Sequence, residues 1–364
     1  MAGEGRAVED MGQLTEFYQG KKVFLTGHTG FKGTWLALLL ERFGAEVYGY
    51  ALAPDTPFFD RAAPRIKRSY EGQIADGARV KEALKETKPD LVFHLAAHST
   101  LTKSYDLTEY IFRTNVMGTV NLLEGLRETP SVGAALIVTS DKCYKNMESD
   151  VPYGEDSPLG AQDPYSTSKA CQDLVAECYR KSFFGREGEN LPVATARASN
   201  VIGGGDYHFD RLLPGILQSF LRGEAATIRN GDAVRPWQYV LDVLEGYLLL
   251  AKALYEAKAG DSSLCGSYNF GPEEDGIVTV RTLTAQAAAE FPNASFMESR
   301  GSAQVAETKT LKISSRKAKD VLHWQRRHTF CDAVRETASF AKREQAGEAV
   351  AEICRDFIER SGIH

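Results

Sequence analysis

The sequence predicts an α/β fold in which a doubly wound parallel sheet is followed by a smaller mixed α/β lobe. Short apolar runs alternate with segments of helical spacing from residue 21 to about residue 197. A glycine-rich turn joins the first run to the first helical segment, and the alternation ends near Arg197. Strands that alternate with helices pair in parallel through right-handed crossovers, and the helices then cover both faces of the sheet.

The expected elements follow from the spacing of apolar residues. In the first helix, Trp35, Leu36 and Leu39 recur at helical spacing. The expected strands of the main sheet are 21–27, 46–50, 90–95, 134–139 and 192–196, and the expected helices are 31–43, 78–87, 105–127 and 164–184. Beyond them we expect helices at 212–222 and up to residue 257, an extended run at 235–240, and a strand at 266–270 that can return to the main sheet.

Composition and charge argue against several classes of protein. Of the 364 residues, 43% are hydrophobic and 25% are charged, which is ordinary for a globular chain with a sizeable core. Lys and Arg number 43 against 49 Asp and Glu, so no basic excess favours a nucleic-acid partner. The first twenty residues lack an apolar run, and no stretch reaches the roughly 18 apolar residues of a membrane span. We therefore expect a cytoplasmic protein with no signal peptide and no membrane partner.

Three glycines form a GxxGxxG pattern between the first strand and the first helix: Gly27, Gly30 and Gly33. Glycine there allows a tight turn and lets the backbone approach a pyrophosphate, which then lies on the N–H groups at the helix start. The position of the pattern in an alternating chain favours a dinucleotide-binding Rossmann fold over a turn that merely needs glycine. The turn also supplies three further candidate cofactor contacts, Thr29, Phe31 and Lys32.

The glycine pattern, together with the end of the alternation near Arg197, suggests how the chain is divided into domains. We expect an N-terminal extension at 1–20, a dinucleotide-binding domain at 21–197, and a mainly substrate-binding lobe at 198–364. The two larger parts are expected to be interleaved, because the strand at 266–270 can join the first of them.

The sequence indicates a dinucleotide more clearly than it distinguishes NAD from NADP. An acidic residue at the end of the second strand would hold the adenosine ribose of NAD, and residues 47–52 contain none. No arginine suited to the 2′-phosphate of NADP lies near that strand end either, so we favour NAD and keep NADP as the alternative. Asp76 lies where an adenine contact could form, or it caps the helix that starts near residue 78.

Tyr165 and Lys169 are four residues apart on a helix that Pro164 can open, so their side chains share one face. A lysine cation beside a phenol, helped by the charge of a nicotinamide, favours the phenolate. A phenolate can take a hydroxyl proton while a hydride leaves the same carbon. The pair is therefore predicted to be catalytic.

Ser140, Asp141 and Lys142 come directly after the strand 134–139, at the edge where α/β sheets bind their ligands. Ser140 can hydrogen-bond the hydroxyl that reacts, and Asp141 and Lys142 supply a proton donor and a proton acceptor side by side. The alternative interpretation is a solvated turn at a strand end that carries one ion pair.

Together these motifs resemble the extended short-chain dehydrogenases/reductases and, within them, the CDP-glucose 4,6-dehydratase family. The resemblance runs from about residue 20 to about residue 330, and its motifs are at 27–33, 94–97, 140–144, 163–169, 197–201 and 235–237. Related dTDP-glucose and GDP-mannose dehydratases usually carry Asp-Glu where this chain has Asp141-Lys142. The resemblance implies NAD as cofactor, a homodimer or homotetramer formed through helices 105–127 and 164–184, and a place in deoxysugar biosynthesis for lipopolysaccharide O-antigen.

The resemblance also implies an internal redox reaction that converts CDP-glucose to CDP-4-keto-6-deoxyglucose. Tyr165, activated by Lys169, takes the C4 hydroxyl proton as NAD takes the C4 hydride, and the new ketone acidifies C5. Asp141 protonates the departing C6 hydroxyl, a proton leaves C5, and the hydride returns to C6. Lys142 stands where relatives carry the glutamate that removes the C5 proton. It acts as a neutral base, favoured by Lys169, the nicotinamide charge and desolvation, or it stays charged and stabilises the enolate.

The remaining contacts implied by the resemblance are to the cofactor for Ala96, Ala97 and Ser199, and to the nucleotide sugar for Asn200. Arg211 and Arg235 lie in the second lobe, and the planar fork of a guanidinium suits a pyrophosphate. We expect both arginines to contact the substrate.

We expect no metal site. The six cysteines include no CxxC pair, which argues against a zinc cluster and, in a reducing compartment, against disulfides. His94 and His98 have HxxxH spacing, but this suits zinc only on one face of a helix, and these residues follow a strand. His98 is instead a candidate contact to the substrate.

Other functions remain open at this point. A nucleotide-sugar 4-epimerase would share the cofactor site and the Tyr165–Lys169 pair, but it needs no acid and base for elimination, so Asp141 and Lys142 speak against it. A dehydratase of another nucleotide-hexose is a second alternative. An NAD-sensing regulator on the same fold is a third, and the presence of Ser140, Tyr165 and Lys169 argues against it.

Overall fold

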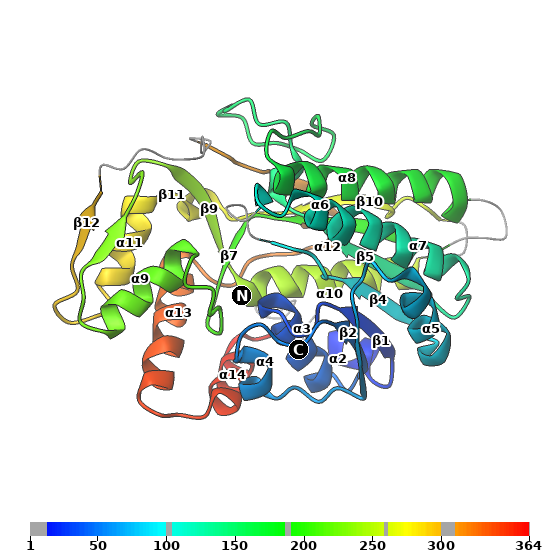
Figure 1. Cartoon of the computed structure of the whole chain (residues 1–364), viewed down its shortest axis with the longest axis horizontal. Helices are drawn as coiled ribbons and strands as arrows, with labels where there is room; N and C mark the ends of the chain where they lie inside the picture. The colour runs from blue at the N-terminus through cyan, green and yellow to red at the C-terminus, as the bar shows by residue number, and fades with distance from the viewer. Residues whose placement is uncertain (1–12, 100–103, 186–190, 258–260, 300–309, 364) are drawn as a thin grey trace, which may run out of the picture.

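The fold is described by a computed structural model that covers residues 13–99, 104–185, 191–257, 261–299 and 310–363 (Figure 1). Residues 1–12 of the expected N-terminal extension lie outside these ranges. The rest of that segment includes helix α2 (Gln13–Tyr18), whose Tyr18 hydroxyl donates a hydrogen bond to the Leu248 carbonyl at 2.8 Å. This part of the segment therefore packs on the core.

The main sheet has seven strands in the order β10-β6-β5-β4-β1-β2-β3, and all of its neighbouring strands pair in parallel. The strands are β1 (Lys22–Thr26), β2 (Glu46–Ala51), β3 (Arg68–Glu71), β4 (Leu91–His94), β5 (Ala134–Val138), β6 (Val193–Ala198) and β10 (Gly266–Phe270). The doubly wound α/β fold is thus confirmed. Because β10 pairs with β6, a strand from late in the chain completes the sheet.

Residues along each central strand alternate between two hydrophobic cores. In β1, Val23 and Leu25 belong to the core that also contains apolar residues of α3 (Phe31–Arg42) and α10 (Val240–Glu256). Phe24 belongs to the core formed with α5 (Gly77–Thr87), α7 (Gly118–Arg127) and α8 (Pro164–Tyr179). Both faces of the sheet are therefore covered, and the strand ends remain available for a site.

Two of the long helices contain π turns. The expected helix 105–127 consists of α6 (Thr108–Ile111), the π-helix η2 (Phe112–Met117) and α7, and α8 continues into the π-helix η4 (Arg180–Phe184). A π turn holds one more residue than an α turn and is frequent at functional sites. The side chains of η2 are consequently out of the register that regular helical spacing predicts.

Strand β3 is not expected from the sequence. Arg68, Ser69 and Glu71 are exposed and Tyr70 is only half-buried, so this edge strand has no apolar run. Charged residues on an edge strand are a common protection against pairing with another chain. The short helix α4 (Phe58–Ala62), between β2 and β3, is also not expected.

The second lobe, at the left of Figure 1, contains two small sheets with helices α9 (Leu212–Leu221) and α11 (Val280–Ala288) beside them. Its strands are β7 (Asn200–Ile202), β8 (Ala226–Ile228), β9 (Val234–Tyr239), β11 (Ile277–Thr279) and β12 (Phe296–Glu298), paired as β11-β9-β7 and β12-β8. Helix α10 leaves this lobe and packs against α3 and β5. The division at residue 197 stays a prediction, since later segments return to the main sheet.

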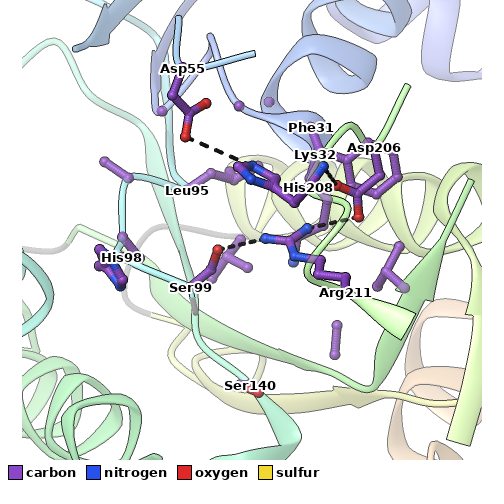
Figure 2. Close-up of a pocket in the computed structure, with 18 of the residues that line it drawn as sticks. Phe31, Lys32, Asp55, Leu95, His98, Ser99, Ser140, Asp206, His208 and Arg211 are labelled. Atoms are coloured by element: carbon purple, nitrogen blue, oxygen red, sulfur yellow. Dashed lines mark hydrogen bonds and ion pairs between the residues drawn. The ribbon is translucent and has the colours of Figure 1, made fainter. Parts of the chain in front are cut away.

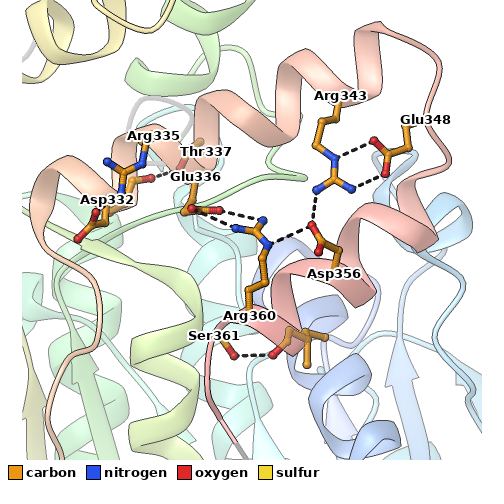
Figure 3. Close-up of polar contacts among 11 residues, drawn as sticks. Asp332, Arg335, Glu336, Thr337, Arg343, Glu348, Asp356, Arg360 and Ser361 are labelled. Carbon is orange, nitrogen blue, oxygen red and sulfur yellow. Dashed lines mark hydrogen bonds and ion pairs between the residues drawn. The ribbon is translucent and has the colours of Figure 1, made fainter.

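The chain ends in three helices, α12 (Arg316–Leu322), α13 (Phe330–Gln345) and α14 (Val350–Arg360). Arg343 of α13 pairs with Glu348 and with Asp356 of α14 (Figure 3). Arg360 of α14 pairs with the same Asp356 at 3.1 Å and with Glu336 of α13 at 3.2 Å. This charge network fixes the two helices together. In the described ranges, no helix has the length and apolar character needed to cross a bilayer.

Candidate active site

A cavity of about 620 Å³ lies at the carboxyl ends of β1, β4, β5 and β6, where residues of the main sheet face residues of the second lobe. Every candidate site residue predicted from the sequence lines this cavity except Asp76 and Arg235. Within the described part of the chain, no group of three or more His, Cys, Asp or Glu residues could hold a metal ion.

The glycine turn leaves little room for side chains at two of its three glycines. A Cβ at Gly33 would lie 2.0 Å from the Gly27 carbonyl oxygen, and a Cβ at Gly27, where φ is +73°, would lie 2.8 Å from the Ala96 nitrogen. At Gly30 the nearest protein atom would be 3.5 Å away, so packing does not require glycine there. Gly30 is the N-cap of α3, lines the cavity and provides no side-chain cap. The N–H groups at the helix start therefore face the cavity, as a pyrophosphate site requires.

The loops after β2 and β3 line the adjoining part of the cavity through Leu52, Ala53, Asp55, Gln73 and Ile74. Sequence patterns do not indicate Gln73 and Ile74, because their position after a strand end becomes evident only once β3 is known. Asp76 lies beyond them and caps α5 by accepting a hydrogen bond from Arg79 N at 3.2 Å. Of the two roles considered for Asp76, the structure shows the helix cap.

Tyr165 and Lys169 reach the cavity from the first turns of α8, on one face of the helix. Asp163 caps this helix by accepting a hydrogen bond from Ser166 N at 2.8 Å, and Pro164 is its first residue. The rigid start of α8 therefore holds the tyrosine and lysine at the cavity wall.

Burial shifts both groups toward their neutral forms. It lowers the pKa of Lys169 to about 7, with a further lowering by the charge of Lys32. It raises the pKa of Tyr165 to about 12, and the charge of Asp141 adds to that rise. The tyrosine is thus a phenol at neutral pH unless a further positive charge beside it favours the phenolate.

Ser140, Asp141 and Lys142 form the start of a 3-10 turn, η3 (Asp141–Cys143), at the end of β5. The Ser140 hydroxyl donates to Asp141 Oδ1 at 2.9 Å and accepts from Lys142 N at 3.2 Å. Asp141 is 2% exposed, and its Oδ2 has no hydrogen-bond partner among the described residues. Burial raises the pKa of Asp141, which favours the protonated carboxyl group. Lys142 is half-buried and lines the cavity beside it.

Asn115, in the π turn η2, supports the site and is not predicted from the sequence. Its side chain accepts a hydrogen bond from His98 N at 2.8 Å and donates to the His98 carbonyl at 3.2 Å and to the Ser168 hydroxyl at 2.8 Å. Ser168 in turn donates to the Tyr165 carbonyl at 2.7 Å. Asn115 thereby ties the loop after β4 to the start of α8. The direction of the Asn115 side chain depends on the extra residue of the π turn, and regular helical spacing in the sequence does not reveal that residue.

His94 is a buried structural residue. Its Nδ1 lies 2.7 Å from Thr26 Oγ1 and its Nε2 lies 3.1 Å from Thr119 Oγ1. Thr119 also accepts a hydrogen bond from Gln172 of α8 at 2.8 Å. Burial, and then the charge of Lys169, lower the pKa of His94 to about 3, so the ring is neutral. This hydrogen-bonded chain joins β1 and β4 to α7 and α8.

Two polar contacts join the second lobe to the loops of the main sheet (Figure 2). Arg211 pairs with Asp206 at 2.9 Å and donates to the Ser99 hydroxyl at 2.8 Å. His208 Nε2 lies 3.8 Å from Asp55 Oδ2. The Arg211 guanidinium is thus held at the cavity wall, where it can meet a bound anion.

The remaining candidate residues, which lie between β6 and β9, differ in whether they line the cavity. Ser199 and Asn200 line the cavity, and the buried Ser199 hydroxyl has no hydrogen-bond partner among the described residues. Arg235 on β9 does not line the cavity, and its Nη1 donates to the Val234 carbonyl at 2.9 Å. Its charge nevertheless contributes to lowering the pKa of Asp141, against the larger effect of burial.

Comparison with known proteins identifies the family. The model of the NAD dependent epimerase/dehydratase family matches residues 23–271. The chain belongs to this family. The CDP-glucose 4,6-dehydratase of Salmonella typhimurium is 41% identical over 317 residues, which cover 85% of this chain and 88% of that relative. A dTDP-glucose 4,6-dehydratase of Xanthomonas campestris is 28% identical over 289 residues, covering 74% of this chain and 77% of that protein.

Solved structures of family members have the same fold. A dTDP-glucose 4,6-dehydratase from Bacillus anthracis in complex with NAD gives a TM-score of 0.74 at 21% identity, covering 90% of this chain and 99% of that chain. A UDP-glucose 4-epimerase from Thermotoga maritima with UDP-glucose gives 0.75 at 20% identity, covering 89% and 99%. The family is NAD-dependent, and the glycine turn, the uncovered start of α3 and the unpartnered Ser199 hydroxyl fit a dinucleotide in the cavity.

Substituting Gly30 by Ala tests the placement of the pyrophosphate. Because a Cβ at Gly30 enters the cavity rather than the protein, Gly30→Ala should fold with an unchanged Tm. The Kd for NAD should rise at least about tenfold, equivalent to about 1.4 kcal/mol. Calorimetric titration with NAD measures the Kd, and circular dichroism measures the Tm.

Gly33→Ala is the matched control, because its Cβ would collide with the Gly27 carbonyl. This variant should lose both NAD binding and thermal stability. Wild-type affinity for NAD in Gly30→Ala would contradict a pyrophosphate at this turn.

Proposed function

We propose that the protein is a CDP-glucose 4,6-dehydratase, which converts CDP-glucose to CDP-4-keto-6-deoxyglucose with NAD as cofactor. The observation that carries the proposal is the meeting of Asp141 and Lys142 with Tyr165 and Lys169 at one cavity. The cavity thus contains one pair suited to redox chemistry and a second pair suited to elimination. The 41% identity to the Salmonella typhimurium CDP-glucose 4,6-dehydratase supports the choice of substrate.

Tyr165, Lys169 and Ser140 act at C4 of the sugar. Bound NAD supplies an acceptor for the C4 hydride and later a donor to C6. Ser140 hydrogen-bonds the C4 hydroxyl, Tyr165 takes its proton, and the charge of Lys169 stabilises the phenolate. The raised pKa of Tyr165, about 12 because of burial, means that this proton transfer depends on the positive charge brought by the cofactor.

Asp141 and Lys142 carry out the elimination. The C4 ketone acidifies the C5 proton, so loss of water needs an acid at the C6 oxygen and a base at C5. Asp141 is suited to be the acid because burial favours its protonated form. Lys142 lies next to it on the cavity wall and removes the C5 proton.

The nucleotide sugar lies between the two lobes. Arg211 and Asn200 face the cavity and bind the diphosphate, and Arg235 adds positive charge from β9. His98, held by Asn115, contacts the sugar. We place the reaction in the cytoplasm, and the six cysteines, all of them free thiols, suit a reducing compartment.

Mass spectrometry tests the reaction and the substrate together. The enzyme is incubated with NAD and, in separate samples, with CDP-glucose, dTDP-glucose, UDP-glucose or GDP-mannose, with no other oxidant or reductant. We expect CDP-glucose alone to lose one water, because oxidation and reduction cancel within the catalytic cycle. An unchanged mass with a new sugar epimer would show a 4-epimerase instead, and water loss from another nucleotide sugar would reassign the substrate.

The role of Lys142 is tested by Lys142→Met in deuterated solvent. If the amine is the C5 base, deuterium incorporation at C5 should fall by at least about a hundredfold, in line with loss of a general base. Nuclear magnetic resonance of the recovered sugar measures this exchange. Lys145→Met is the matched control, since Lys145 is exposed and does not line the cavity. Full exchange in Lys142→Met would show that Lys142 is not the base.

We also propose that the protein forms a homodimer, or a tetramer built from it, through the α6–η2–α7 helix and α8. These helices lie side by side (Figure 1). Large apolar side chains are exposed on them or next to them, including Leu174 (52%) and Met117 (48%), with Tyr105 and Leu107 nearby in sequence. Such exposure on one monomer is typical of an interface, and a two-fold axis would bury the residues of both copies.

Leu174→Arg tests this interface. A charge at the centre of an apolar contact is costly to bury, so the variant should sediment as a monomer at concentrations where the wild-type protein is oligomeric. Met297→Arg is the control, because Met297 is 58% exposed but lies on β12 of the second lobe. Monomeric wild-type protein, or an oligomeric Leu174→Arg variant, would contradict the proposed interface.

A further inference from the structure

A buried ion pair lies behind the catalytic cavity. Arg197 on β6 and Asp173 on α8 are 3% and 2% exposed, and Arg197 Nη2 and Nε each lie 3.1 Å from Asp173 Oδ1. Removing two charges from water is unfavourable unless other hydrogen bonds compensate. The hydrogen bonds that this ion pair makes to its neighbours therefore show which elements it connects.

Those neighbours come from several parts of the chain. The Thr195 hydroxyl donates to Asp173 Oδ1 at 2.6 Å, and Arg197 donates from Nη2 to the Ser267 hydroxyl at 2.9 Å. Arg197 Nη1 also donates to the Tyr144 hydroxyl at 2.8 Å, and that hydroxyl donates to Asn269 Oδ1 at 2.7 Å. The network thus joins α8, β6 and β10 to the segment after β5.

Two members of the network follow catalytic residues closely in the chain. Asp173 is one helical turn beyond Lys169 on α8, and Tyr144 is two residues beyond Lys142 at the end of η3. Tyr144 is 1% exposed and Asn269 is fully buried, so neither can move without disturbing the core. The ion pair is therefore the buried connection between the helix that carries the redox pair and the turn that carries the elimination pair.

We propose that Tyr144, Arg197 and Asp173 are positioning residues that hold the Asp141–Lys142 turn in register with the Tyr165–Lys169 helix. This inference rests on the proposed dehydratase function. Tyr144 acts on the elimination, because its hydroxyl fixes the turn that carries the acid and the base. Asp173 acts on the oxidation, because it lies on the helix of Lys169.

The charge of Asp173 has an additional effect on Lys169. Burial and Lys32 lower the pKa of Lys169 to about 7, whereas Asp173 raises it. Without the Asp173 charge, Lys169 would lose its proton at a lower pH. The network therefore maintains the positive charge that stabilises the Tyr165 phenolate, as well as the geometry.

Tyr144→Phe is the decisive variant, because it removes one hydroxyl and keeps the ring. Tyr153→Phe is the matched control. The Tyr153 ring stacks on Tyr144 with centroids 5.4 Å apart, but its hydroxyl bonds to Met147 N and Asn146 Oδ1, outside the network. Rapid mixing with CDP-glucose and NAD follows C4 oxidation by the near-ultraviolet absorbance of reduced nicotinamide, and mass spectrometry follows water loss.

We expect Tyr144→Phe to slow water loss by about tenfold to a hundredfold, as a small misplacement of catalytic groups does. C4 oxidation should keep its wild-type rate, so reduced nicotinamide should accumulate, and Tyr153→Phe should behave as wild type. Equal rates of water loss in the two variants, or an equal slowing of oxidation and water loss in Tyr144→Phe, would overturn the proposal. Water loss by the wild-type enzyme is scored separately, so failure of the dehydratase function itself is recognised independently.

Asp173→Asn provides a second test that does not depend on how well Tyr144→Phe folds. The amide keeps the Oδ1 acceptor for Thr195 and Arg197 but removes the charge. Because Asp173 raises the pKa of Lys169, its loss should move the alkaline limb of the kcat profile for C4 oxidation to lower pH. Thr195→Val, which keeps both charges, should leave the limb in place. An unmoved limb in Asp173→Asn would overturn the assignment of Asp173.

Discussion

Burial at the centre of the cavity is the constraint on which the rest of the site depends. Lys32, Lys169, Tyr165 and Asp141 all lie where charge is poorly solvated. Burial lowers the pKa of Lys32 to about 8 and of Lys169 to about 7, and it raises the pKa of Tyr165 to about 12. It also raises the pKa of Asp141. Each group is thereby moved toward neutrality, so the protonation states of these groups depend on the charges that a bound dinucleotide brings beside them.

The scaffold holds these groups through buried polar contacts rather than through apolar packing alone. Asn115 joins the loop after β4 to α8, and His94 lies within a second chain of hydrogen bonds from β1 to α8. Such networks fix orientation because a buried donor or acceptor without its partner is costly. Helix α8 is consequently held from several sides, which limits how far Tyr165 and Lys169 can move from the ends of the strands.

The parts of the molecule that are predictable from sequence are those with a strong local pattern. The central strands are continuous apolar runs, and α3 and α8 have clear apolar spacing with glycine or proline at their starts. Strand β3 is not predicted because it is a polar edge strand. The supporting role of Asn115 is not predicted because this residue lies in a π turn. No pattern in the sequence indicates that Asp173 and Arg197 contact each other. Only tertiary packing, which brings α8 onto β6, shows that they are a buried pair.

Strand β10 is synthesised well after the other six strands of the main sheet, so the sheet is incomplete for part of synthesis. Residues 22–198 contain six strands of the main sheet, but the edge of β6 stays unpaired and one face of β5 stays uncovered until α10 and β10 have been made. An unpaired edge and a bare apolar face expose a chain to association with other chains. The main sheet is therefore assembled from parts that are far apart in the sequence, and a nascent chain that stops after β6 is an incomplete folding unit. Residue 198 is therefore a poor place for an insertion or a fusion, because β6 ends there and pairs with β10 in the sheet.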